Sequence, residues 1–81
     1  MEIKEVEKQI NRDIRAIKKS LIKRAKKGLY ENFGQRELRD LESKYFDYIY
    51  KSEHVRRALT EFNNWALNFD LRSVRAWNIN Y

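Results

Sequence analysis

The first third of the chain carries apolar residues at a helical spacing. Counted from Ile3, the steps between successive apolar positions are 3, 4, 4, 3, 4 and 4 residues, and no glycine or proline interrupts residues 2–27. The mean spacing of about 3.67 residues is typical of a nearly straight α-helix. The positions are Ile3, Val6, Ile10, Ile14, Ile17, Leu21 and Ala25. We therefore predict an amphipathic helix over residues 2–27.

Two later stretches repeat this spacing over shorter lengths. The first, residues 35–51, aligns on one face Leu38, Leu41, Tyr45, Tyr48 and Ile49. The second, residues 53–69, aligns on one face Val55, Ala58, Leu59, Phe62, Trp65, Ala66 and Phe69. Ser52 precedes the second stretch at the position of an N-cap. An aromatic stripe at this spacing is typical of a core, so we predict two further helices over these ranges.

The segment GLYENFGQRE, residues 28–37, contains both glycines and joins the first two predicted helices. Gly28 follows a lysine-rich turn, where a left-handed residue ends a helix without strain from a Cβ atom. Either Asn32 or Gly34 then begins the second helix, since each is followed three positions later by a Gln or Glu. The segment is sufficiently explained as a helix end, an aromatic that closes the core and a helix start. The alternative is that Tyr30, Glu31 and Asn32 also contact a partner.

Short connections between amphipathic helices favour antiparallel neighbours. We therefore predict an all-α fold, a three-helix antiparallel bundle that forms a single domain over residues 1–81. The first helix would be about 39 Å long and the others about 25 Å each. Part of the first helix must then overhang, bend or meet another surface, and we predict a homodimer. Residues 70–81 form a short C-terminal tail, for which a helical turn and an extended, strand-like segment both stay open.

Cysteine and proline are absent from the 81 residues, and His54 is the single histidine. Disulfides, thiolate metal sites and a thiol nucleophile are thereby excluded, and one histidine does not build a zinc site. Glu53 and His54 are adjacent, so on a helix their side chains do not face each other. We expect no enzyme activity, no metal and no cofactor. A charged N-terminus without a long apolar run favours a soluble, cytoplasmic protein.

The net charge of +6 is concentrated in the first predicted helix. Residues 1–27 hold ten Lys and Arg against four acids, a balance of +6, whereas residues 28–81 hold eight of each. Six cations gather opposite the apolar face: Lys8, Arg12, Arg15, Lys19, Lys23 and Lys26. One interpretation is a soluble polar face whose late cations suit the helix dipole. The other is a surface for an anionic partner, because like charges at i,i+4 destabilise a helix by about 0.2–0.5 kcal/mol.

Three kinds of anionic surface match these six cations. A nucleic-acid backbone would contribute about six phosphates, and an acidic groove of a protein offers similar complementarity. A membrane is the weakest match, because the apolar face has no Trp or Phe to anchor it, and we expect no membrane contact. Aromatic and arginine side chains outside the predicted core add candidate protein contacts. They are Tyr30, Phe46, Tyr50, Arg56, Arg57, Trp77 and Tyr81, among which Phe46 and Tyr50 form an i,i+4 pair on the second predicted helix.

The strings GLYENFGQRELRDLESKY and YIYKSEHVRRALTEFNNW span about residues 28–70. This part of the chain resembles a family of small, largely uncharacterised proteins from phages and prophages of Gram-positive bacteria. Its members share a lysine-rich first helix and a GLYENFGQ(K/R)E box, which here runs from Gly28 to Glu37. The resemblance brings no activity with it. It implies a small phage protein without catalytic residues, which binds host machinery or defence complexes.

We therefore expect a non-enzymatic, phage-type effector that binds and inhibits a host or defence protein or nucleoprotein complex. The alternative is a sequence-independent DNA- or RNA-binding protein that uses the six cations of the first helix. Phosphate binding predicts a steep loss of affinity with salt. Protein docking predicts sensitivity to Trp77→Ala or Tyr81→Ala.

Overall fold

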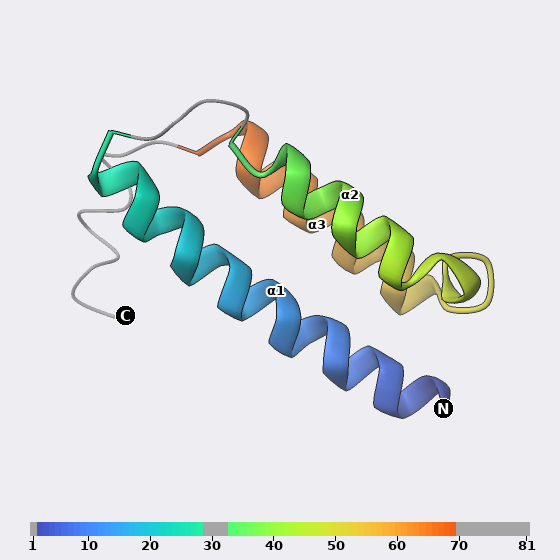
Figure 1. The fold of residues 1–81 in the computed structure, drawn as a ribbon. Coiled ribbons are helices and arrows are strands. Elements are labelled where there is room, and N and C mark those ends of the chain that lie inside the picture. Colours follow the sequence, from blue (N-terminus) through green and yellow to red (C-terminus); the bar gives the residue numbers. More distant parts are fainter. Residues whose placement is uncertain (1, 29–32, 70–81) are drawn as a thin grey trace.

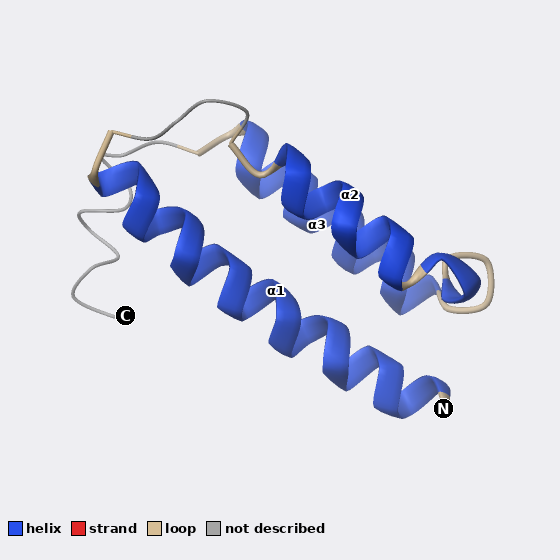
Figure 2. Cartoon of the chain, in the orientation of Figure 1, coloured by secondary structure: helices blue, strands red, loops and turns tan. Residues whose placement is uncertain are grey.

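The computed structural model describes residues 2–28 and 33–69, which form three α-helices and one short 3-10 turn. In chain order they are α1 (Ile3–Lys26), α2 (Gln35–Lys44), η1 (Phe46–Tyr48) and α3 (Glu53–Leu67). α2 runs antiparallel to α1, and α3 returns antiparallel to α2 and packs against both α1 and α2 (Figure 1). The prediction of an all-α, three-helix bundle is confirmed, and the described residues contain no strand (Figure 2). Tyr30, Asn32, Trp77, Tyr81 and the rest of the tail lie outside the described residues.

All three helices contribute apolar side chains to one core. Its buried members are Val6, Ile10, Leu21, Leu41, Tyr45, Val55, Leu59 and Phe62. At one end of the bundle Phe33 packs against this core, with its ring centroid 5.6 Å from that of Trp65 and 4.3 Å from that of Phe69. Tilted contacts between rings at this range stabilise by about 0.5–1.5 kcal/mol beyond their buried area. The prediction that an aromatic of the connection closes the end of the core is confirmed for Phe33.

The two glycines hold the backbone shape of the connection between α1 and α2. Gly28 has φ of +84° directly after the α1 C-cap Lys27, as the sequence predicts. Gly34, the second of the two proposed starts, is the N-cap of α2 with φ of +78°. A Cβ atom built on Gly34 would lie 2.7 Å from the Cβ atom of Ala66, whereas one built on Gly28 would meet nothing within 4 Å. Gly34 is therefore required by close packing against α3 as well as by its dihedral angle.

The prediction of one continuous helix over residues 35–51 is wrong. α2 ends at Lys44, and Tyr45 follows with φ of −107° and ψ of 18°. The chain then tightens into η1, where the Tyr48 N–H donates to the Tyr45 carbonyl at 2.9 Å. The segment YFDYIY has a lower helix propensity than the QRELRDLESK of α2, because aromatic and β-branched side chains lose rotamer freedom in a helix. Phe46 and Tyr50 are therefore not an i,i+4 pair on one helix.

α3 is two residues shorter than predicted, because it ends at Leu67 and not at residue 69. Its C-cap Asn68 donates a side-chain hydrogen bond of 2.8 Å to the Asn64 carbonyl, which satisfies one of the last helical acceptors. At the other end the Ser52 hydroxyl accepts a hydrogen bond from the Val55 N–H at 3.3 Å, so the predicted N-cap is confirmed.

The first helix does not overhang the rest of the bundle, which was one of the three alternatives for its unmatched length. Val6 and Ala25, near its two ends, are each 1% exposed in a single copy of the chain. The turn around η1 lengthens the α2 arm, so that Ser52 reaches Glu7 at the N-terminal end of α1. The apolar face also differs from the prediction at both ends, since Ile3 is exposed and Ile22 is buried. The homodimer stays a prediction. The unmatched helix length, which was the argument for it, is not found in the structure.

Candidate cationic interface

The polar residues of α1 divide by direction into two flanks and an outward face. One flank faces α2, where Asp13 and Arg24 contact Tyr45 and Glu37. The other flank faces α3 and includes Glu7, Asn11 and Lys18. At about 100° per residue these flanks border the buried stripe on either side, and the outward face lies opposite it.

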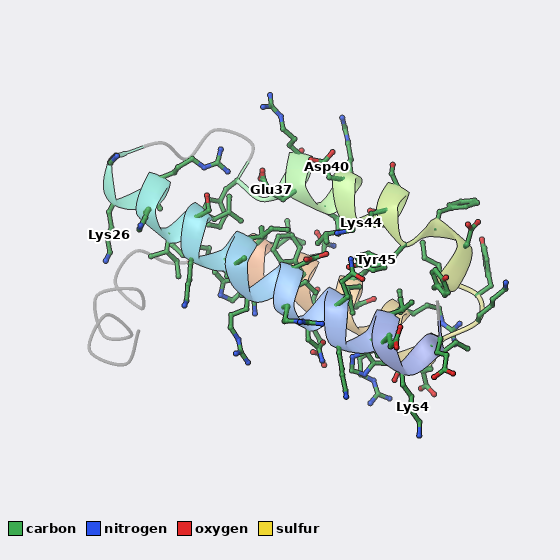
Figure 3. All side chains as sticks on the ribbon, turned by 60° about the horizontal axis from the view of Figure 1, so that its bottom comes forward. Lys4, Lys26, Glu37, Asp40, Lys44 and Tyr45 are labelled. Atoms are coloured by element: carbon green, nitrogen blue, oxygen red, sulfur yellow. The ribbon has the colours of Figure 1, made fainter. Side chains whose placement is uncertain are left out.

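On the α2 flank, two acids hold cations and a tyrosine in place. The Asp13 carboxylate accepts hydrogen bonds from the Tyr45 hydroxyl at 2.5 Å and from Lys44 Nζ at 2.8 Å. Arg24 forms an ion pair with Glu37 at 3.2 Å. Glu37, Lys44 and Tyr45 are labelled in Figure 3, where they line the side of α2 that faces α1. These side-chain contacts join α1 to α2.

Burial and hydrogen bonding shift the pKa values of this pair in opposite directions. Burial alone would raise the pKa of the Asp13 carboxyl, but hydrogen bonds from Lys44 and Tyr45, together with the charges of Lys44 and Arg12, lower it below its ordinary value. Burial, followed by the bond to Asp13, raises the pKa of the Tyr45 hydroxyl well above its ordinary value. The contact is therefore one between a carboxylate and a neutral phenol at neutral pH.

The α3 flank is held by polar contacts near the start of α1 and by an aromatic contact further along the helix. Ser52 Oγ donates to Glu7 at 2.8 Å, and His54 Nε2 lies 3.1 Å from Asn11 Oδ1. The Lys18 ammonium lies 5.1 Å from the ring centroid of Trp65, within the range of a cation–π contact. Both flanks of α1 thus serve the fold.

The outward face of α1 contains the six cations singled out in the sequence, and all six are exposed: Lys8, Arg12, Arg15, Lys19, Lys23 and Lys26. The first five form no ion pair with a described residue, in contrast to Arg24 on the same helix. Lys4, which the sequence analysis did not include, extends this face at the N-terminal end. Figure 3 shows Lys4 and Lys26 near the two ends of α1, pointing away from α2. We call the six predicted residues together with Lys4 the cationic face.

No acid of α2 or α3 forms an ion pair with the first five predicted cations of the cationic face. Glu37 reaches Arg24 on the α2 flank, and Glu53 pairs with Arg57 within α3 at 3.1 Å. Asp40 lies on the outer side of α2, away from α1 (Figure 3). Repulsion along the cationic face is therefore not relieved by an ion pair between its first five predicted cations and the described residues.

The other predicted contact residues are divided between exposed and engaged side chains. Phe46 is 63% exposed and Tyr50 is 83% exposed, so both are accessible around η1. Arg56 donates to the Ile49 carbonyl at 2.8 Å, and Arg57 is held by Glu53. The structure therefore does not bring the two arginines to the cationic face, and it gives each of them an internal partner.

A pocket between α1 and α3 was missed by the sequence analysis. It has a volume of about 330 Å³ and is lined by Asn11, Ile14, Arg15, Lys18, Ala58, Glu61 and Phe62. Arg15 belongs both to this pocket and to the cationic face, so the two are continuous. The spacing of Asn11, Arg15 and Lys18 places them on one side of a helix, but only the packing of α3 makes that side concave.

No family model, curated protein or solved structure matches this chain. Among the described residues, no group of His, Asp or Glu side chains is placed to hold a metal ion. Within the same residues, no helix has the length and apolar character needed to cross a membrane. The geometry of the cationic face and the pocket is therefore the basis for a functional proposal.

Proposed function

We propose that this chain is a non-enzymatic effector that docks, through the cationic face of α1, on an electronegative host or defence protein or nucleoprotein complex and inhibits it. The observation that carries the proposal is the contrast within one helix. Arg24, on a flank, forms an ion pair with Glu37, whereas no ion pair with a described residue is formed by the outward-facing Lys8, Arg12, Arg15, Lys19 and Lys23. The resemblance to small phage proteins supports the biological setting.

The physical argument starts from repulsion. The cationic face contains like charges at i,i+4, such as Arg15 with Lys19 and Lys19 with Lys23, and each such pair destabilises a helix by about 0.2–0.5 kcal/mol. An acidic partner surface relieves this repulsion and accelerates association by electrostatic steering. The exposed Phe46 and Tyr50 offer apolar anchors at the η1 end of the bundle.

A second candidate is sequence-independent binding of nucleic acid. Lys8 to Lys23 span about 22 Å of helix at 1.5 Å per residue, which suits a run of phosphates. The engagement of Arg56 and Arg57 in internal contacts favours backbone binding over the reading of bases. This candidate differs from the first in its response to nuclease and to salt.

The test is affinity capture from host lysate, with and without nuclease, by the wild-type chain and by the double variant Lys19→Gln/Lys23→Gln. The matched control is Arg36→Gln/Arg39→Gln, which removes the same charge from exposed positions of α2 that form no ion pair with a described residue. We expect nuclease-resistant capture of a protein by the wild type and the control, and its loss in the α1 variant. Capture that is equal for all three chains contradicts the proposal.

The same material distinguishes the second candidate. Capture that nuclease abolishes, with a slope of log affinity against log salt near about −5 on duplex DNA, supports phosphate binding instead. In that case Lys19→Gln/Lys23→Gln weakens binding to all sequences alike.

A further inference from the structure

The pocket between α1 and α3 combines an apolar part with a partly buried cation. Ile14, Ala58 and Phe62 form its apolar lining, and Phe62 is fully buried. Its volume of about 330 Å³ lies at the small end of the usual range for ligand sites, roughly 300–1,000 Å³. A space of this size suits one or two side chains and not a large cofactor.

Lys18 is the partly buried cation of this pocket. It is half-buried beside Trp65 and forms no ion pair with a described residue. Burial lowers the pKa of Lys18, an effect that the charge of Glu61 only partly opposes. An added carboxylate at the pocket would therefore stabilise the charged form of Lys18.

The lining favours an acidic protein segment over a nucleic-acid strand. Nucleic-acid strands bind proteins by phosphate contacts and by stacking of bases on exposed aromatic rings. The one aromatic ring of the pocket, that of Phe62, is 1% exposed and is not accessible for stacking. Glu61 lies on the α3 side of the pocket. A peptide with an apolar side chain next to a carboxylate fits both parts of the pocket, its apolar lining and its two cations, Arg15 and Lys18.

We infer that this pocket binds an acidic segment of a partner protein, by taking an aliphatic side chain against Ile14 and Ala58 while a neighbouring carboxylate pairs with Lys18 and Arg15. The inference rests on the proposed function and names the chemistry of the partner. Because Arg15 is shared, the acidic segment would continue from the pocket along the cationic face. Glu61 fixes its direction by accepting a backbone N–H on the opposite wall.

The experiment measures binding of three fluorescein-labelled probes by fluorescence anisotropy. The first is a short peptide of repeated Leu-Glu pairs, the second is a Ser-Glu peptide of equal length and charge, and the third is mixed-sequence single-stranded DNA. Burial of one leucine side chain gives about tenfold tighter binding of the Leu-Glu peptide than of the Ser-Glu peptide. Equal affinities of the wild type for the two peptides overturn the inference, as does an absence of binding to both.

Two variants with matched controls locate the binding. Ala58→Leu fills the pocket and is expected to abolish the preference for Leu-Glu, whereas Ala16→Leu adds the same side chain at an exposed position of α1 and keeps it. Lys18→Gln is expected to weaken the binding of both peptides about tenfold. Lys8→Gln, on the exposed cationic face, is expected to weaken the binding of both peptides by less than about fivefold. Circular dichroism shows whether each variant is folded. If Ala58→Leu does not fold, the comparison of Lys18→Gln with Lys8→Gln still tests the pocket.

The outcomes also distinguish this inference from the proposed function. A preference for Leu-Glu that survives both Ala58→Leu and Lys18→Gln overturns the pocket as the site. DNA that binds more tightly than either peptide, and that is weakened by both Lys18→Gln and Ala58→Leu, overturns the acidic segment as the occupant of the pocket. Neither result bears on the proposed function of the cationic face. That proposal is contradicted if Lys19→Gln/Lys23→Gln captures the same partner as the wild type.

Discussion

The Tyr45 hydroxyl donates a hydrogen bond of 2.5 Å to Asp13 Oδ2 and so fixes the end of α2 against the middle of α1. Tyr45 is 3% exposed, while Asp13 retains a second bond from Lys44. A hydrogen bond to a charged group stabilises by about 1.5–3 kcal/mol, and the partial exposure of Asp13 places this one at the lower end. The contact is thus one of the polar links between α1 and α2, beside the ion pair of Arg24 with Glu37.

Tyr45→Phe removes this hydroxyl and leaves the ring in the core. We expect the free energy of unfolding to fall by about 1–2 kcal/mol, because the carboxylate loses one of its two donors. Urea denaturation followed by circular dichroism measures the change. Tyr50→Phe is the control, since that side chain is 83% exposed and its hydroxyl makes no hydrogen bond to a described residue. A loss equal to that of the control would show that the bond does not contribute to stability.

The lowered pKa of Asp13 predicts a specific acid sensitivity. A carboxyl whose pKa is lower in the folded state contributes stability that is present above its unfolded pKa, about 3.9, and that is lost as the pH falls through the folded value. The free energy of unfolding should therefore fall more steeply below about pH 4 in the wild type than in Asp13→Asn. Thermal unfolding at a series of pH values checks this. Parallel curves for the two chains would contradict the assignment of this loss to Asp13.

Gly34 and Gly28 form a matched pair for the cost of an added side chain. Both have positive φ, so replacement by alanine costs about 1–2 kcal/mol of backbone strain at either site. At Gly34 the new Cβ atom also meets Ala66 at 2.7 Å, which adds about 1–3 kcal/mol. We expect Gly34→Ala to be destabilised by about 2–5 kcal/mol and Gly28→Ala by about 1–2 kcal/mol, measured by urea denaturation. Equal losses would mean that α3 moves away from α2 without cost.

Ser52 serves two contacts with one hydroxyl. It accepts from the Val55 N–H as the N-cap of α3, and it donates to Glu7 of α1. Ser52→Ala is expected to lower the free energy of unfolding by about 1–2 kcal/mol, because an N-cap and a hydrogen bond to a carboxylate are lost together. Ser43→Ala, at an exposed position of α2, should change it by less than about 0.5 kcal/mol. Thermal melts of both variants make the comparison.

The sequence predicted the elements of this fold well because its signals are local. The helical spacing of α1, the left-handed Gly28 and the N-cap Ser52 depend on residues close in the chain, and all three are confirmed. The choice between Asn32 and Gly34 as the start of α2 was not decided locally. The structure starts α2 at Gly34, beside which α3 brings Ala66, a residue distant in sequence.

What the sequence could not show are the contacts between helices. Tyr45 fits a continuous apolar stripe, yet α2 ends before it, and its hydroxyl finds Asp13 on another helix. The cationic face was visible from charge spacing alone, but the pocket beside Lys18 exists only because α3 packs next to α1. Burial of Val6 and Ala25 likewise depends on the turn around η1, whose shape the periodicity of residues 35–51 concealed.

The cationic face predicts that charge removal weakens binding without harming the fold. Lys19 and Lys23 are exposed, and each has another cation three or four residues away on α1. Lys19→Gln/Lys23→Gln relieves several repulsive pairs of about 0.2–0.5 kcal/mol each, so we expect a chain as stable as the wild type or up to about 1 kcal/mol more stable. Arg24→Gln, which breaks the ion pair with Glu37, should instead lower stability by up to about 1 kcal/mol. Urea denaturation of both variants beside the capture experiment tests this, because a destabilised Lys19→Gln/Lys23→Gln chain would mean that these lysines serve the fold and not a partner.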